Sequence, residues 1–291
     1  MRFIYFFLIF FISFTFSKAF AQQYTFLGVL KIDNKSQQSL SYSIMFTEEN
    51  GKIKGYSITD MAGRHETKNK IEGFYNSKTG MLSFKESSIV YTKSTVSKGL
   101  FCFVNFNGKI GRKHNMSYLN GKFTGLRDNS TPCVNGQIEL IGNKDLEALI
   151  AKANKKIQNS KLIKNEEKID LNHTIDSLKG QYVNSNENLN VFVNDVEQVK
   201  IRIWDNANED GDRINLYLNE QLILKDYEVV NQKKEITLNI MAEKNVLKIV
   251  ALNQGSQGLN TVMMTIDGED IKFQSNLKTN EYSTITFYKK K

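Results

Sequence analysis

One acidic stretch of the chain has residue types and spacing that could form a binding site. It runs from Trp204 to Ile214 and places oxygen-bearing side chains at near-alternate positions around Gly211. Carboxylate and amide oxygens are the ligands that Ca²⁺ prefers, and the ion takes roughly six to eight of them. The stretch therefore predicts a set of candidate calcium ligands: Asp205, Asn206, Asn208, Asp210 and Asp212.

The same stretch matches the EF-hand calcium loop only in part. Tyr217 stands where that loop needs a bidentate glutamate, and Arg213 stands where an apolar residue is usual. A plain polar turn also explains the residues, because Asp210-Gly211 is a turn signal by itself. Acidic turns are common, so the sequence favours the turn and leaves a metal site or a polar contact surface as alternatives.

Alternating apolar and polar residues predict strands on both sides of the acidic stretch, over 199–204 and 214–219. Strand-like runs continue to the end of the chain, at 222–224, 235–240, 246–252, 261–266, 271–274 and 283–288. Many short strands joined by short polar turns are typical of a β-sandwich. We therefore predict an immunoglobulin-like or jelly-roll β-sandwich domain over residues 184–291.

The first half of the chain repeats a five-residue pattern with a central glycine between apolar or aromatic residues. Glycine within a strand marks a bend or a close approach of two backbones, and repeated bends curl a sheet toward a barrel. Residues 22–143 are therefore predicted to form an antiparallel meander curled toward a barrel. The glycines lie at positions 28, 55, 73, 108, 121 and 136.

Residues 1–21 have the composition of a signal peptide. Arg2 precedes a run of apolar residues, and Ala19-Phe20-Ala21 is a typical cleavage site. The apolar run is shorter than a bilayer of roughly 30 Å requires, and no later stretch approaches that length. The sequence predicts an exported protein without a transmembrane segment after signal removal, located in the periplasm or outside the cell.

Export makes a disulfide the expected state of Cys102 and Cys133, the two cysteines of the chain. Closing a loop of about 31 residues would stabilise the fold by roughly 3–4 kcal/mol in the chain-entropy model. A catalytic thiol is the alternative, but no histidine is placed to suggest a partner for it.

Between the two β regions, residues 144–183 are predicted to hold an amphipathic helix followed by a polar linker. Apolar residues recur at helical spacing over 144–160, with Asn143 as the expected cap. The apolar side of this helix is expected to pack against the barrel or its neighbour.

Charge is distributed unevenly along the chain. Residues 22–143 carry 16 Lys/Arg and 9 Asp/Glu, whereas residues 184–291 carry 13 and 16. The lysines are scattered over alternating strands without an arginine cluster, so the sequence argues against a nucleic-acid partner. A polyanionic glycan or lipopolysaccharide is the more suitable anionic partner for an exported protein. No hydrolase, zincin, P-loop or dinucleotide-binding motif occurs, so no catalytic residue is proposed.

Two resemblances extend these predictions. The strand Ile71 to Tyr75, followed by the turn Lys78-Thr79-Gly80, resembles secreted lipocalin-like barrels, although their glycine-tryptophan opening is absent. Residues Ile203-Trp204-Asp205 and the Asp-Gly-Asp sequence after them resemble a β-sandwich accessory module of uncharacterised secreted two-domain proteins of Gram-negative bacteria. Similar sandwiches serve as carbohydrate-binding or adhesive modules, often with structural calcium, which is analogy at the level of the fold.

The expected function is that of an exported, non-enzymatic binding or accessory protein. Its partner would be a glycan, an envelope component or another protein, and Ca²⁺ is the one cofactor that the residues suggest. The alternative is a lipocalin-like carrier that holds a small apolar ligand in residues 22–143. No ligand-binding residues can be named from the sequence.

Overall fold

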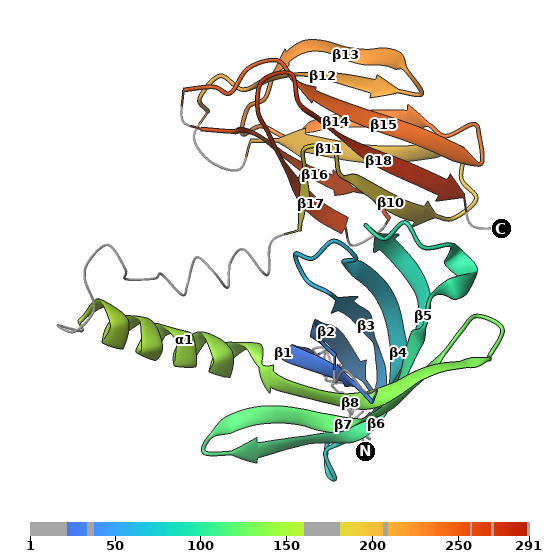
Figure 1. Cartoon of the computed structure of the whole chain (residues 1–291), viewed down its shortest axis with the longest axis vertical. Coiled ribbons are helices and arrows are strands. Elements are labelled where there is room, and N and C mark those ends of the chain that lie inside the picture. Colours follow the sequence, from blue (N-terminus) through green and yellow to red (C-terminus); the bar gives the residue numbers. More distant parts are fainter. Residues whose placement is uncertain are drawn as a thin grey trace, which may run out of the picture.

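The computed structural model of the chain describes residues 22–33, 38–159, 181–205, 209–256, 258–268 and 271–289. The predicted signal peptide and residues 160–180 of the predicted linker lie outside this part. The described chain is mainly β, with one α-helix and a short 3-10 helix, η1 (Lys98–Leu100) (Figure 1). Among these residues, no helix is both long and apolar enough to cross a membrane.

The first eight strands form a closed antiparallel barrel. Each strand pairs with the next one along the chain, and the last pairs with the first. The prediction of a curled meander is confirmed, and the curl goes to full closure. The strands are β1 (Gln22–Ile32), β2 (Ser39–Glu49), β3 (Lys52–Thr59), β4 (Thr67–Asn76), β5 (Met81–Thr92), β6 (Phe103–Lys113), β7 (Met116–Leu126) and β8 (Pro132–Gly142).

Inward-facing side chains and glycines shape the barrel. Fifteen buried residues form one hydrophobic cluster in its interior, among them Phe46, Phe84 and Phe106. Glycine is required where neighbouring strands approach most closely: a Cβ added to Gly55 would lie 2.0 Å from the carbonyl oxygen of Met45. The recurring glycines of the sequence are therefore points of close backbone approach, as bends in a tightly curved sheet require.

The predicted disulfide is present. Cys102 and Cys133 are bonded, with their Cα atoms 6.1 Å apart. The bond joins the segment just before β6 to the beginning of β8, and these two strands flank β7 in the barrel wall. It therefore closes a loop that contains two of the eight strands and the turn between them.

The helix α1 (Asn143–Gln158) corrects two details of the prediction. Asn143 is the first helical residue, and Gly142 occupies the cap position without a side-chain hydrogen bond. The first turn is held instead by Asp145, whose Oδ2 accepts a hydrogen bond from the backbone N–H of Ser117 at 2.8 Å. No residue of α1 is buried, and the helix runs away from the barrel (Figure 1). The helix adjoins β1 and β8 of the barrel, as expected, but this contact buries none of its residues.

The last ten strands form a β-sandwich of two layers. One layer has the order β13-β12-β15-β18-β10 and the other β14-β11-β16-β17-β9. Two pairings are parallel, β10 with β18 and β9 with β17, and the others are antiparallel. The strands are β9 (Tyr182–Asn184), β10 (Asn188–Val193), β11 (Gln198–Trp204), β12 (Arg213–Leu218), β13 (Gln221–Glu228), β14 (Lys234–Asn239), β15 (Lys244–Ala251), β16 (Asn260–Ile266), β17 (Ile271–Leu277) and β18 (Tyr282–Lys289).

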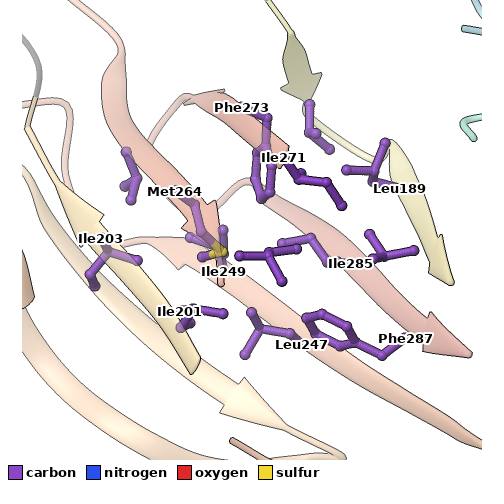
Figure 2. Close-up of a cluster of buried hydrophobic side chains, with 14 of the residues drawn as sticks. Leu189, Ile201, Ile203, Leu247, Ile249, Met264, Ile271, Phe273, Ile285 and Phe287 are labelled. Carbon is purple, nitrogen blue, oxygen red and sulfur yellow. The ribbon is translucent and has the colours of Figure 1, made fainter. Parts of the chain in front are cut away.

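The sandwich core is built from alternate residues of both layers. Figure 2 shows Ile201 and Met264 of one layer among Leu247 and Phe287 of the other, and all four are fully buried. Polar residues occupy the intervening positions, as expected for strands with one face in the core. This packed core fixes the ends of β11 and β12, between which the acidic stretch lies.

Barrel and sandwich share one continuous sheet. The last residues of β5 leave the barrel and pair with β10, with Tyr91 opposite Val191 and Thr92 opposite Asn190. Lys93 forms an ion pair with Glu187 at 3.5 Å beside this junction. The result is a 13-stranded sheet. The sequence did not predict it, because the pairing of β5 with β10 joins residues about 100 positions apart in the chain.

Candidate metal centre

Two strands of the sandwich hold the acidic stretch at both of its ends. β11 ends at Trp204 and β12 begins at Arg213, so the flanking strands are as predicted. The backbone N–H of Asp205 donates to the carbonyl of Val230, and the N–H of Val229 donates to the carbonyl of Asp212. Both ends of the stretch are thus tied to the segment that joins β13 to β14. Gly211 has φ +85°, the left-handed conformation that the predicted turn requires.

Three of the five candidate ligands come together. Each of Asp205, Asp210 and Asp212 offers a carboxylate oxygen, and these oxygens all lie within 4.8 Å of one another. Two oxygens that each lie about 2.4 Å from a shared calcium ion are at most about 4.8 Å apart, so the spacing suits this ion. Asn206 and Asn208 lie outside the described residues, and the structure does not test them.

Burial distinguishes this cluster from an ordinary acidic turn. The side chains of Asp205 and Asp212 are 2% and 1% exposed. Oδ2 of Asp212 accepts a hydrogen bond from the backbone N–H of Thr261 at 2.7 Å. Oδ1 of Asp212 is also buried, and it has no hydrogen-bond partner in the described part of the chain. A buried carboxylate oxygen without a donor is costly, because burial removes the water that would solvate it.

The electrostatics of the cluster also indicate that its negative charges are unfavourable without a cation. Burial raises the pKa of Asp212 to about 6, and the neighbouring carboxylates of Asp210 and Asp205 raise it as well, while the hydrogen bond from Thr261 opposes them. The cause is the cost of placing negative charges close together away from water. A divalent cation among the three carboxylates would remove that cost.

A fully satisfied buried acid in the barrel provides a comparison. Glu86 is 6% exposed, and burial raises its pKa. Its Oε1 accepts hydrogen bonds from the hydroxyls of Tyr42 at 3.0 Å and Ser57 at 2.5 Å, and its Oε2 accepts one from the N–H of Val104 at 2.8 Å. Protein donors thus serve both oxygens of Glu86, as in a structural polar network. Oδ1 of Asp212 has no such donor among the described residues.

The segment between β15 and β16 also contacts the candidate centre. The N–H of Ser256 donates to the carbonyl of Asp210 at 3.0 Å. Gly255 has φ +58°, and a Cβ added there would lie 2.5 Å from Oδ1 of Asp210. Glycine is needed at this position for the segment to approach the Asp210 carboxylate.

Two asparagines near the cluster were not predicted as site residues. Asn253 bridges the stretch, because its Nδ2 donates to the carbonyl of Gly211 and its Oδ1 accepts from the N–H of Arg213, both at 2.7 Å. Asn260 is fully buried, and its Nδ2 donates to the carbonyl of Arg213 at 3.1 Å. The Oδ1 atom of Asn260 is buried without a hydrogen-bond partner among the described residues. Sequence patterns did not indicate either residue, because both lie far from the acidic stretch along the chain.

The single tryptophan of the chain adjoins the cluster in the sequence. Trp204 precedes Asp205 and is 6% exposed, and the ammonium group of Lys233 lies 4.7 Å from its ring centroid. An indole at this position is a natural spectroscopic reporter for the centre.

The chemistry that this arrangement offers is cation binding. Its ligands are hard oxygens from carboxylates, and the described cluster contains no histidine or cysteine, the ligands that zinc prefers. No protein-family model, curated protein or solved structure matches the chain. The two family resemblances drawn from the sequence therefore stay predictions.

Proposed function

We propose that the protein is an exported, non-enzymatic binding protein whose sandwich carries a calcium site formed by Asp205, Asp210 and Asp212. The observation that supports it is the buried Oδ1 of Asp212, which belongs to a cluster of three carboxylates and has no hydrogen-bond donor in the described part of the chain. The ion would neutralise three carboxylates that repel one another, and so hold the stretch from Asp205 to Asp212 in one conformation. Its role is to fix the shape of this end of the sandwich, without taking part in a reaction.

Rigid loops at this end of the sandwich would help the protein to recognise a binding partner. The ligands follow β11 and precede β12, while their supports come from the segments after β13 and β15. Loops at the end of a sandwich form a surface that can contact a partner. The partner that we propose is a glycan, an envelope component or another protein.

Two further features support export. The first 21 residues have the composition of a signal peptide, and Cys102 and Cys133 are disulfide-bonded. Disulfides persist in oxidising compartments. Calcium sites of extracellular modules have dissociation constants on the order of 10⁻⁴–10⁻³ M. An affinity in this range would suffice outside the cytosol.

The alternative function, a carrier of a small apolar ligand, gains no support from the barrel. The inward positions of the barrel are occupied by the buried hydrophobic cluster that includes Tyr42, Phe46 and Phe106. The packed interior therefore favours the binding-protein hypothesis over the carrier hypothesis.

Thermal unfolding of the mature chain, residues 22–291, tests the proposed calcium site. A ligand at about a hundredfold excess over its Kd stabilises the folded state by about 2.7 kcal/mol, so Ca²⁺ should raise Tm by about 5–10 °C over EDTA. Asp210→Ala should abolish this rise. Asp195→Ala is the matched control, since Asp195 is an exposed acid of the same sandwich that pairs with Lys289. Equal Tm values in Ca²⁺ and EDTA would refute the site.

A further inference from the structure

The outer wall of the barrel carries a groove that is separate from the candidate calcium centre. Its volume is about 1140 Å³, and it crosses β6, β7, β8 and β1, with Leu146 of α1 at its border. Four adjacent strands at about 4.8 Å spacing give it a width of about 14 Å. We call this surface the barrel groove.

Strand register arranges the outward side chains of the barrel groove in rows. The apolar row beside α1 contains Tyr118, Ile141 and Leu27 at paired positions. The next two rows are polar. One contains Lys109, Asn120 and Glu139 and ends at the apolar Val29, and the other contains Lys122 and Gln137, whose paired neighbours Asn107 and Lys31 lie outside the groove lining.

The barrel groove has an excess of positive charge. Lys109, Arg112, Lys113 and Lys122 all line it and are exposed. None of the four lies within ion-pair distance of a carboxylate in the described part of the chain. Among the described residues, Glu139 is the one acid that lines the groove, and its carboxylate forms an ion pair with Lys31 at 2.7 Å. The groove therefore has about four cationic groups available to an anionic partner.

We infer that the barrel groove binds an anionic polysaccharide. Its cationic groups complement carboxylate or sulfate substituents. The amides of Asn120 and Gln137 lie between them and can exchange hydrogen bonds with sugar hydroxyls. The ring of Tyr118 offers an apolar face with a polar edge. The groove is open, so a long chain can pass through it.

Other anionic macromolecules suit this surface less well. Binding of single-stranded nucleic acid relies on successive bases that stack on several aromatic rings, and among the described residues the groove is lined by Tyr118 and the imidazole of His114 alone. Insertion into a lipid surface requires a large apolar face, whereas two of the three rows are polar. The inference does not depend on the calcium centre, because no residue of that centre lines the groove.

Binding of the intact mature protein to dextran sulfate and to neutral dextran, measured by calorimetry, tests the inference. The protein should bind dextran sulfate and not dextran. The double variant Lys109→Glu/Lys122→Glu should weaken this binding at least about tenfold, because each lysine near an anionic surface contributes appreciably. Lys244→Glu/Lys278→Glu changes net charge equally, at exposed lysines of the sandwich, and should weaken binding less than about twofold.

A variant that keeps every charge separates a site from general attraction to a basic protein. Tyr118→Ser should weaken dextran sulfate binding about threefold or more, since an aromatic contact is lost. Equal weakening by the two lysine double variants would overturn the inference. Tighter binding of oligothymidylate or phosphatidylglycerol vesicles, lost in Lys109→Glu/Lys122→Glu, would overturn it in favour of another class of partner. Tm values in EDTA verify that each variant is folded.

Discussion

Replacing Asp212 by asparagine should have opposite effects on stability in the absence and in the presence of calcium. Asparagine has almost the same shape, and its oxygen can still accept the hydrogen bond from the N–H of Thr261. The substitution removes one negative charge from the cluster with Asp205 and Asp210. Without calcium that removal relieves repulsion, and with calcium it removes a ligand.

The magnitude follows from the pKa of Asp212, which is about 6 in the folded chain and about 3.9 when unfolded. Below both values the carboxyl group is protonated in both states and has no effect. Between them the folded state retains the proton that the unfolded state releases, so the free energy of unfolding falls as pH rises. Above pH 6 the loss is complete, at about 3 kcal/mol for a pKa difference of about 2.

The assay is thermal unfolding of wild type and Asp212→Asn in EDTA at pH 4 and pH 7. At pH 7 the variant should be more stable by up to about 3 kcal/mol, or about 6–10 °C in Tm, and at pH 4 the two should nearly coincide. With Ca²⁺ at pH 7 wild type should gain stability and the variant should not.

The control is Asp226→Asn, because a hydrogen bond from Arg213 lowers the pKa of this exposed carboxyl. It should give no stabilisation at pH 7 in EDTA and should leave the response to Ca²⁺ intact. Our reasoning would be refuted if Asp212→Asn destabilised the calcium-free protein at pH 7. An equal gain at pH 4 and pH 7 would also contradict it, since the gain would then not come from charge.

Two further predictions concern the barrel. Cys102→Ser/Cys133→Ser should lower the free energy of unfolding by roughly 3–4 kcal/mol in denaturant titrations, because the bond spans 31 positions; an unchanged midpoint would contradict this. Gly55→Ala should destabilise the protein by more than about 2 kcal/mol, because its Cβ would meet backbone that cannot move away. Gly111→Ala is the control, as its Cβ would have no neighbour within 4 Å; equal Tm values for the two variants would show that strand approach does not select glycine.

Local patterns predicted much of the fold. Alternation located β11 and β12, the period of the apolar residues located α1, and the recurring glycines indicated a curled sheet. Each of these features depends on residues close together in the chain. The strands β9 and β10 were not predicted: β9 has only three residues, and the six-residue alternation of β10 follows a long polar region.

Features that depend on residues far apart in the chain could not be predicted from local sequence patterns. Closure of the barrel rests on pairing of β8 with β1, and the junction with the sandwich rests on pairing of β5 with β10. The acidic stretch predicted the candidate ligands, but its sequence did not indicate which carboxylates would be buried. The backbone N–H of Thr261, which donates to Oδ2 of Asp212, comes from a segment about 50 positions farther along the chain.

Terbium luminescence is the measurement that tests the calcium site most directly. Tb³⁺ substitutes for Ca²⁺ at oxygen sites and emits when a nearby indole transfers energy to it, and Trp204, the one tryptophan of the chain, precedes Asp205. We predict saturable emission on excitation of Trp204 that excess Ca²⁺ reverses, that Asp210→Ala abolishes and that Asp195→Ala leaves unchanged. Absence of sensitised emission, together with no calorimetric signal for Ca²⁺, would contradict the proposed site.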